Sequence, residues 1–156
     1  MKLESIGNKL VIYLYNIDNL DFKNKKDLEE YFKVLFKKLK EIYNIKISGY
    51  YNINVYIDNI YGIIIELEKE QLDYYDYFNN QVDMHILTED TKFLYLIEDY
   101  FPFINLKNIE IYKYKNKIYI LPLENTNLIY ILENSKLVYK ETLDILKYGK
   151  KVEIKE

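Results

Sequence analysis

The stretch NKKDLEEYFKVLFKKLKEIY, residues 24–43, carries the clearest structural signal in the chain. Its apolar residues recur at intervals of three and four, which places them along one side of an α-helix. They are Leu28, Tyr31, Phe32, Leu35, Phe36, Leu39, Ile42 and Tyr43. Asn24 suits the N-cap position, and the acidic start and lysine-rich end of the stretch suit the helix dipole. The stretch is therefore predicted to be an amphipathic helix that covers one face of a sheet.

Strand patterns flank this helix on both sides. Residues 9–15 (KLVIYLY) are mostly β-branched or aromatic and follow a turn-prone Gly-Asn pair. Residues 51–57 (YNINVYI) alternate apolar and polar side chains, and a turn at 58–62 leads into a partner strand at 63–67. The first half of the chain is thus predicted to be β-α-β-β.

The second half opens with a predicted strand at residues 82–87. A helix is predicted next, over the apolar residues between 93 and 101. Thr88 or Asp90 can serve as its N-cap, and Pro102 ends it. The segment IEIYKYKNKIYIL, residues 109–121, then predicts a second hairpin with a polar turn.

Three further elements complete the predicted second half. They are a helix capped by Asn125 or Thr126, a helix near residues 140–148 that stops at a left-handed Gly149, and a strand at residues 151–155. The second half is thus predicted to be β-α-β-β-α-α-β.

This order of elements predicts an α+β fold. We expect antiparallel sheets with helices packed on one face, arranged as two ferredoxin-like halves. The N-terminal half spans residues 1–70, an acidic, tyrosine-rich connector spans 71–81, and the C-terminal half spans 82–156. Each half alone would be a marginal domain, so the two are expected to pack together as one unit.

The composition of the chain excludes several kinds of chemistry. Its 156 residues include 19 tyrosines and one histidine, but no arginine, alanine, cysteine or tryptophan. Several of its abundant residues, such as lysine, isoleucine, asparagine and tyrosine, have AT-rich codons, yet thiol chemistry and arginine-fork recognition are excluded whatever the origin of the bias. The lack of cysteine fits a reducing cytoplasm. No apolar run approaches the roughly 20 residues that span a bilayer, and the start does not resemble a secretory signal, so we expect a cytoplasmic protein without membrane contact.

Catalytic motifs are few. Ser5, Ser48 and Ser135 lack the glycine-flanked context of a nucleophile elbow, and the four glycines stand too far apart for a phosphate-binding loop. Adjacent carboxylates do not share one helical face. The sequence therefore predicts a non-enzymatic protein with no cofactor.

A metal hypothesis stays open at His85, the single imidazole in the chain. Asp83 lies two residues earlier in the same predicted strand and on the same face, so the two can share a metal ion. Their spacing is not specific to zinc, and an ordinary strand histidine is the simpler interpretation. A small metal-dependent enzyme around these two residues is one alternative function.

The connector carries the candidate partner-binding residues, which alternate between acidic and aromatic types. They are Asp73, Tyr74, Tyr75, Asp76, Tyr77 and Phe78. The run lacks the glycine and the terminal glutamate of an EF-hand loop, so it does not indicate a specific calcium site. A solvated linker also fits the pattern. Because tyrosines are amphipathic anchors at interfaces, the segment is predicted to bind a protein partner.

Lysines on the predicted first helix give an RNA-binding alternative. Lys33, Lys37 and Lys40 share one stripe, with Phe22 and Tyr43 beside the helix. The net charge of −3 and the lack of an RNA-recognition strand motif argue against this function. A solvated helix face is the simpler interpretation, so nucleic acid is not the expected partner.

The segments FLYLIEDYF (93–101), IEIYKYKNKIYILPL (109–123) and ILKYGKKVEI (145–154) occur in an order that resembles the C-terminal domain of the MecA adaptor family. The opening MKLESIGNKLVIYLY also resembles the way MecA proteins begin. The resemblance implies an N-terminal domain that binds substrate proteins and a C-terminal domain that docks on a Clp-type unfoldase, with no catalytic residue. This chain is shorter than the family and has a compact acidic run where the family has a long linker. We therefore expect a cytoplasmic protein-interaction protein of the adaptor type.

Overall fold

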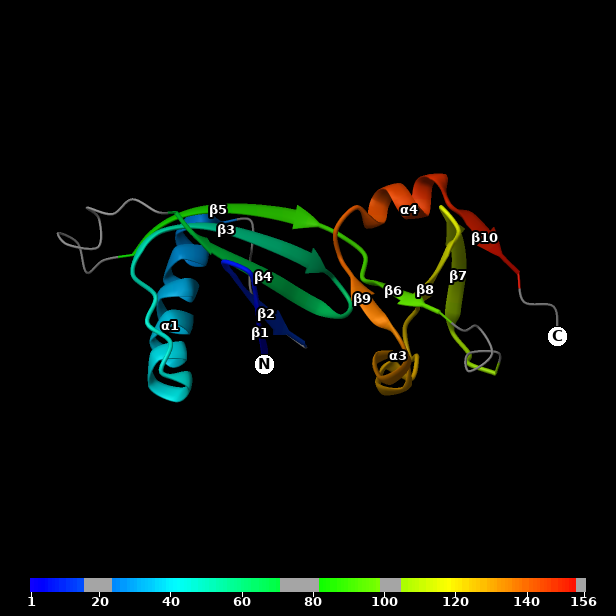
Figure 1. Ribbon diagram of the computed structural model, residues 1–156, viewed down its shortest axis with the longest axis horizontal. Coiled ribbons are helices and arrows are strands. Elements are labelled where there is room, and N and C mark those ends of the chain that lie inside the picture. The colour runs from blue at the N-terminus through cyan, green and yellow to red at the C-terminus, as the bar shows by residue number, and fades with distance from the viewer. Residues whose placement is uncertain (16–23, 71–81, 99–104, 154–156) are drawn as a thin grey trace. The chain divides into compact units, whose positions relative to one another are not determined.

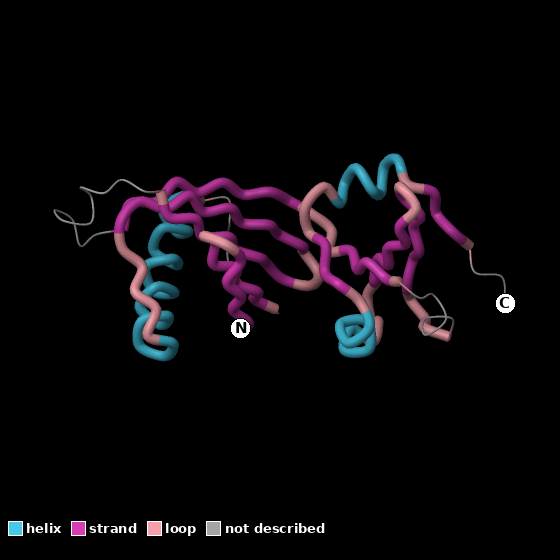
Figure 2. Tube along the Cα trace, viewed as in Figure 1, coloured by secondary structure: helices cyan, strands magenta, loops and turns pink. Residues whose placement is uncertain are grey.

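The computed structural model describes residues 1–15, 24–70, 82–98 and 105–153 (Figure 1). Within these residues the protein is α+β, with two five-stranded, mostly antiparallel sheets and three helices (Figure 2). The predicted fold class is confirmed. Contacts divide the chain into a first unit, Met1–Ile57 with Gly62–Glu89, and a second unit, Asp58–Tyr61 with Asp90–Glu156.

The sheet of the first unit has the strand order β1-β2-β4-β3-β5. Its strands are β1 (Lys2–Ile6), β2 (Lys9–Leu14), β3 (Gly49–Asp58), β4 (Gly62–Lys69) and β5 (Val82–Asp90). β2 pairs antiparallel with both β1 and β4, so that Val11 lies opposite Glu4 on one side and Glu66 on the other. β3 and β5 point the same way in Figure 1. The predicted strands on either side of the helix are confirmed.

Helix α1 (Lys25–Tyr43) is the predicted amphipathic helix, and asparagines cap both of its ends. The Lys26 amide donates a hydrogen bond to Asn24 Oδ1 at 3.1 Å, which satisfies one of the amides left open at a helix start. At the other end Asn44 adopts a left-handed conformation with φ 55°, and its amide bonds back to the last turn. The helix therefore begins and ends where its sequence predicts.

One apolar stripe of α1 packs on the first sheet. The buried residues of the stripe are Leu28, Phe32, Leu35, Phe36 and Leu39. The strand residues in the same core are Ile12, Tyr51, Ile53, Val55, Ile63, Ile65 and Leu67. Since successive residues of a strand point to opposite faces, these residues define the face that α1 covers.

The sequence pattern does not predict β1. Four of its five residues are exposed and Leu3 is half-buried, so the segment has no apolar face for a pattern to reveal. Gly7, with φ 61°, turns the chain back into β2. Tyr13 then fastens the pair, because its hydroxyl donates a hydrogen bond to Glu4 Oε2 at 3.1 Å.

β5 belongs to the sheet of the first unit, where it lies beside β3. The sequence-based division placed this strand in the C-terminal half, after a connector at residues 71–81. Contacts instead put the division between Glu89 and Asp90. Residues 71–81 suggested a boundary because their sequence is polar. Which sheet the following strand joins depends on tertiary contacts, and a local sequence pattern does not reveal those contacts. The packing of the two halves as one unit stays a prediction.

The sheet of the second unit has the strand order β10-β7-β8-β6-β9. Its strands are β6 (Leu94–Ile97), β7 (Ile109–Tyr114), β8 (Lys117–Pro122), β9 (Lys136–Val138) and β10 (Lys150–Val152). The predicted β7–β8 hairpin is confirmed, with Lys115 and Asn116 in its turn at φ 48° and 61°. Two consecutive left-handed residues make the tight turn that matches the twist of a hairpin.

β6 corrects the prediction of a helix at residues 93–101. Its four residues form a strand between β8 and β9, and residues 99–101 lie outside the described part of the chain. Leu94 and Tyr95 are both fully buried, although neighbouring residues of a strand point to opposite faces. A strand covered on both faces has a continuous apolar sequence, which periodicity does not distinguish from a buried helix.

Helix α3 (Leu128–Asn134) begins one residue later than the predicted caps allow. Asn127 is its N-cap and accepts a hydrogen bond from the Tyr130 amide at 3.3 Å. The Thr126 hydroxyl instead donates to the Leu123 carbonyl at 2.7 Å, so it holds the preceding loop. The prediction of Asn125 or Thr126 as the cap was wrong for this reason. β9 follows α3 and, with three residues, is too short for a pattern to predict.

Helix α4 (Thr142–Tyr148) ends at Gly149 as predicted, but the glycine is not left-handed. Its φ is −72° and its ψ 155°, and its amide donates to the Ile145 carbonyl at 2.8 Å. A Cβ atom at this position would collide with the same carbonyl oxygen, so close approach of the backbone requires the glycine. β10 starts directly afterwards, and residues 154–156 lie outside the described part of the chain.

Candidate functional site

The predicted partner-binding residues lie outside the residues that the structure describes. They are Asp73, Tyr74, Tyr75, Asp76, Tyr77 and Phe78. Partner binding by this segment stays a prediction. Other residues, which the structure describes, form the candidate surface.

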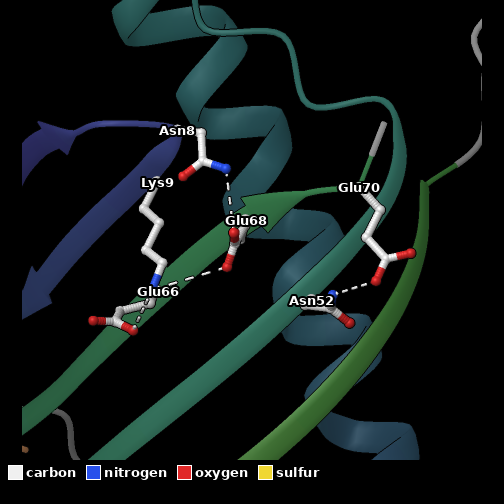
Figure 3. Close-up of polar contacts among 6 residues, drawn as sticks. All are labelled: Asn8, Lys9, Asn52, Glu66, Glu68 and Glu70. Carbon is white, nitrogen blue, oxygen red and sulfur yellow. Dashed lines mark hydrogen bonds and ion pairs between the residues drawn. The ribbon is translucent and has the colours of Figure 1, made fainter. Parts of the chain in front are cut away.

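The face of the first sheet opposite α1, which we term the open face, carries the buried side chains of Val11, Tyr56 and Ile64 and, beside them, a cluster of polar side chains. It includes Lys9 of β2, Asn52 of β3, and Glu66 and Glu68 of β4. These residues alternate along their strands with the core residues, so they point away from α1. Figure 3 shows their side chains on the near side of the strands, with α1 on the far side.

Lys9 is the cation beside Glu66 and Glu68 on the open face. Its Nζ lies 4.0 Å from Glu66 Oε2 and 3.9 Å from Glu68 Oε2. The Asn8 amide Nδ2 donates a hydrogen bond to Glu68 Oε1 at 3.2 Å. The Glu66 side chain is only 4% exposed, so Lys9 offsets part of the cost of burying a carboxylate.

Asn52 and Glu70 hold the end of β4 against β3. The Asn52 Nδ2 donates a hydrogen bond to Glu70 Oε1 at 2.7 Å, and the Glu70 amide donates to the Tyr50 carbonyl at 2.9 Å. Glu66 and Glu68 lie nearby in the same view (Figure 3). Glu68 and Glu70 are the more exposed of these carboxylates, so they make this end of the open face locally acidic.

β5 forms one edge of the same sheet, and its two faces differ. Met84 and Ile86 are half-buried and pack against the core that α1 covers. His85 and Leu87 alternate with them and therefore point to the open face. His85 is exposed, and Leu87 is 57% exposed. A large apolar side chain thus stands in solvent on an edge strand.

The metal hypothesis gains no further ligand from the described residues. Among them, no three His, Asp or Glu side chains gather closely enough to hold a metal ion. His85 lies on the exposed side of β5. The pairing of His85 with Asp83 at a metal ion stays a prediction.

β5 differs from the other edge strands of the two sheets. β1 has five residues, and β9 and β10 have three each. Each of these three strands also carries a lysine, at Lys2, Lys136 and Lys150. Short length and edge lysines are the usual means by which proteins prevent pairing with another chain. β5 has nine residues, VDMHILTED, with no lysine, proline or glycine. Of the edges that the structure describes, β5 is the best suited to accept another strand.

The lysines of α1 lie on its solvent side. Lys33, Lys37 and Lys40 are exposed, opposite the buried stripe of the helix. Glu30 and Glu41 are exposed on the same helix. The helix surface is therefore mixed in charge rather than a continuous basic patch.

The second unit exposes an apolar pair on α3. Ile129 is 70% exposed and Leu132 39% exposed, and their spacing of three residues places them on the same side of the helix. Ile131 between them is fully buried and anchors the helix. The sequence pattern did not single out this pair, because it does not tell which side of a short apolar helix faces the core.

In both sheets a glutamate accepts a hydrogen bond that ties an outer strand to its neighbour: Glu4 of β1 from Tyr13 of β2, and Glu110 of β7 from Lys151 of β10. The Tyr112 hydroxyl donates to Glu110 Oε2 at 2.7 Å, and Lys151 of β10 donates to Glu110 Oε1 at 3.2 Å. The bond from Tyr112 is the main cause that lowers the pKa of Glu110. Burial, followed by this bond, raises the pKa of Tyr112 to about 12. Burial and the bond to Glu4 likewise raise the pKa of Tyr13 to about 12. Hydrogen bonds to nearby glutamates thus account for the hydroxyls of both tyrosines.

The candidate surface therefore consists of the β5 edge together with the acidic open face beside it. Among the described residues, no helix is both long and apolar enough to cross a membrane. Comparison of the chain with protein-family models, with curated proteins and with solved structures finds no match.

Proposed function

We propose that the protein is a non-enzymatic interaction protein that binds other proteins through the edge of β5. The observation that carries this proposal is the nine-residue edge strand itself, on which Leu87 is 57% exposed. An open sheet edge offers backbone amides and carbonyls to an incoming strand, whose main-chain hydrogen bonds supply affinity. Lysine, proline and short length are among the features that protect natural sheet edges, and β5 has none of these three.

The chemical groups of the chain also support binding over catalysis. The chain has no cysteine or arginine, and its one histidine is exposed on β5. The carboxylates and amides of the open face contact one another and Lys9, an arrangement that suits electrostatic contact with a partner. The tyrosine-rich residues 73–78 are proposed as a further contact with the partner.

The finer form of the proposal is a cytoplasmic, MecA-like adaptor for a Clp-type unfoldase. Two compact units support it, because an adaptor needs separate surfaces for two partners. The β7–β8 hairpin, the two short helices and β10 also support it, since the resemblance to MecA proteins rests on these elements. The resemblance includes a helix at residues 93–101, whereas the structure has the strand β6 at Leu94–Ile97. In this scheme β5 binds substrate proteins, and the Ile129–Leu132 pair on α3 contacts the unfoldase.

Affinity capture from a native lysate with matched variants tests the proposal. Leu87→Lys adds a blocking charge to the β5 edge, and Leu143→Lys adds the same charge to α4. The two leucines are 57% and 56% exposed, so the substitutions disturb the fold equally little. Proteins captured by the wild type should be lost with Leu87→Lys and kept with Leu143→Lys. Equal capture by both variants, or recovery of nucleic acid in place of protein, would contradict the proposal.

RNA binding is a second candidate, favoured by the exposed positions of Lys33, Lys37 and Lys40 on α1. Binding through these lysines would release counterions, so the affinity for single-stranded RNA should fall with added salt. Replacing all three lysines by glutamine should weaken binding further. An affinity that is independent of salt, or unchanged by the triple replacement, would eliminate this candidate.

A further inference from the structure

We propose that β5 pairs with β5 of a second copy of this chain, antiparallel about Leu87, and joins two first sheets into one. The inference rests on the proposed function, because it uses the same edge, and it adds how that edge is regulated: two paired copies cover each other's edge. β5 is the outermost strand of its sheet, and no strand that the structure describes pairs with its outer side (Figure 1). Two identical edges match each other in length and in hydrogen-bonding groups.

The symmetry of such a pair limits which residues face each other. Two identical antiparallel edge strands are related by a twofold axis perpendicular to the sheet, so the α1 sides of both copies lie on the same face. Opposed residues then share a face, and the axis passes through one residue and its own copy. With Leu87 on the axis, residues 84–90 of the two strands overlap, all of them within β5.

On the open face, this register brings together side chains that suit one another. His85, Leu87 and Glu89 alternate along β5 on that face, and all three are exposed. Leu87, which is 57% exposed, faces Leu87 of the second copy, so the two apolar side chains shield each other from water. His85 faces Glu89 of the second copy, and symmetry makes this pair twice. An imidazole N–H donates to a carboxylate in either protonation state, and a positive charge on the ring strengthens the pair.

On the α1 side, the same register places Ile86 opposite Thr88 and Met84 opposite Asp90. Ile86 and Met84 are half-buried against the core, whereas Thr88 and Asp90 are exposed. Asp90 is the last residue of β5, so its pair with Met84 lies at the two ends of the interface. The centre of the interface is therefore apolar, and the two His85–Glu89 pairs flank it on the open face.

The neighbouring registers lack these pairs. With Ile86 on the axis, His85 faces Leu87. With His85 on the axis, two imidazoles face each other. With Thr88 on the axis, Leu87 faces Glu89 and the overlap shortens to residues 86–90. Of these registers, the one about Leu87 is thus the most favourable.

The dimer should be weak enough to open. Permanent dimers commonly bury roughly 2,000 Å² or more, and a single pair of short strands is smaller than that. We expect a dissociation constant on the order of 10 μM. Dilution of the chain, or a protein that competes for the edge, would then free β5 for the proposed function.

Sedimentation velocity of the purified chain, at about 1–200 μM, measures this self-association. The wild type should pass from monomer to dimer across this range. Leu87→Lys sets two ammonium groups opposite each other and should weaken the dimer about tenfold or more. Leu143→Lys, at a leucine that is 56% exposed, should leave the dimer unchanged. A wild type that stays monomeric, or equal dimerisation of the two variants, would overturn the inference.

A charge exchange tests the register. His85→Glu alone and Glu89→Lys alone each set like charges opposite each other and should weaken the dimer. A mixture of the two variants sets the new glutamate opposite the new lysine and keeps one original His85–Glu89 pair, so heterodimers should form with near wild-type affinity. A mixture of His85→Glu with Glu133→Lys, which makes the same change of charge at an exposed position on α3, should not restore the affinity. Equal restoration in the two mixtures would show a diffuse charge effect and overturn the inference.

The outcomes separate this inference from the proposed function. If the wild type stays monomeric while capture of lysate proteins depends on Leu87, the inference fails and the docking edge stands. If the chain dimerises through Leu87 but no capture depends on it, the proposed function fails and the pairing of two copies stands. A captured protein added in excess should dissociate the dimer, and a dimer that persists with that protein bound would overturn the regulation of the edge.

The variants are suited to these comparisons because each replaces an exposed side chain. Their thermal unfolding at low concentration should therefore match that of the wild type.

Discussion

The Nζ of Lys9 lies 4.0 Å from Oε2 of Glu66, which is buried on the central strand of the first sheet. The lysine keeps 33% of its side chain exposed, whereas the glutamate side chain keeps 4%. A buried carboxylate is costly unless a cation or hydrogen-bond donors compensate for lost water. Lys9 should therefore matter more for stability than a lysine on the surface.

We expect Lys9→Met to lower the free energy of unfolding by about 1–2 kcal/mol, less than for a fully buried pair because solvent screens Lys9. Urea denaturation measures the change. Lys37→Met, on the exposed side of α1, is the control and should change stability by less than about 0.5 kcal/mol. Adding Glu66→Gln to Lys9→Met should recover part of the loss. Equal effects of the two lysine variants would contradict the role of Lys9.

Phe32 should be the main anchor of α1 on the first sheet. It is fully buried, and its ring centroid lies 5.8 Å from that of Tyr31 and 5.9 Å from that of Phe36. Phe32→Ala leaves a cavity and should lower the free energy of unfolding by about 3–5 kcal/mol. Val34→Ala, at a position that is 56% exposed, is the control and should have little effect. Comparable losses in the two variants would mean that α1 buries a different face.

The Glu110–Tyr112 hydrogen bond should make the stability of the second unit depend on pH at both extremes. The pKa of Glu110 is lowered in the folded chain, so its contribution is present above the ordinary value of 4.5 and is lost as the pH falls through the folded value. The pKa of Tyr112 is raised to about 12, so its contribution is complete below 10.0 and is lost as the pH rises toward 12.

The midpoint of unfolding should therefore change less with pH in Tyr112→Phe than in the wild type, at both acidic and alkaline pH. Tyr148→Phe, which changes a tyrosine that is 67% exposed, should follow the wild-type profile. Identical profiles for the wild type and Tyr112→Phe would show that this hydrogen bond does not contribute to stability.

The β7–β8 turn should tolerate glycine but not alanine at Asn116. Asn116 has φ 61°, a left-handed conformation in which a Cβ atom is strained and asparagine is one of the better-tolerated residues. Asn116→Ala should lower the free energy of unfolding by about 1 kcal/mol, and Asn116→Gly should leave it unchanged or raise it. Chemical denaturation distinguishes the two. Equal stability of both variants would show that the turn adopts another conformation.

The parts of the fold that were predicted correctly share a local cause. α1 has its own caps and a continuous apolar stripe, and the β7–β8 hairpin has a turn pair that favours left-handed conformations. The parts that were missed depend on tertiary neighbours. β6 is buried on both faces by other segments, and β5 joins the first sheet only through its pairing with β3.

The candidate surface shows the same limit. A strand was predicted at residues 82–87, but edge position is a property of the whole sheet, so Leu87 could not be recognised as exposed. Glu66 and Lys9 lie 57 positions apart in the chain, and only the pairing of β2 with β4 brings them together. The tyrosines at 73–78, which the sequence singled out, lie outside the described residues.

Hydrogen exchange of the β5 backbone amides, measured with and without a protein captured by the wild type, tests most directly whether β5 is a binding edge. Alternate residues of an edge strand point their amides toward the free side, where an added strand would take up their hydrogen bonds. These amides of Val82–Asp90 should exchange about tenfold or more slowly with saturating partner, while those of β9 and β10 should not change. Unchanged exchange along β5, or slowing confined to another edge, would contradict the account.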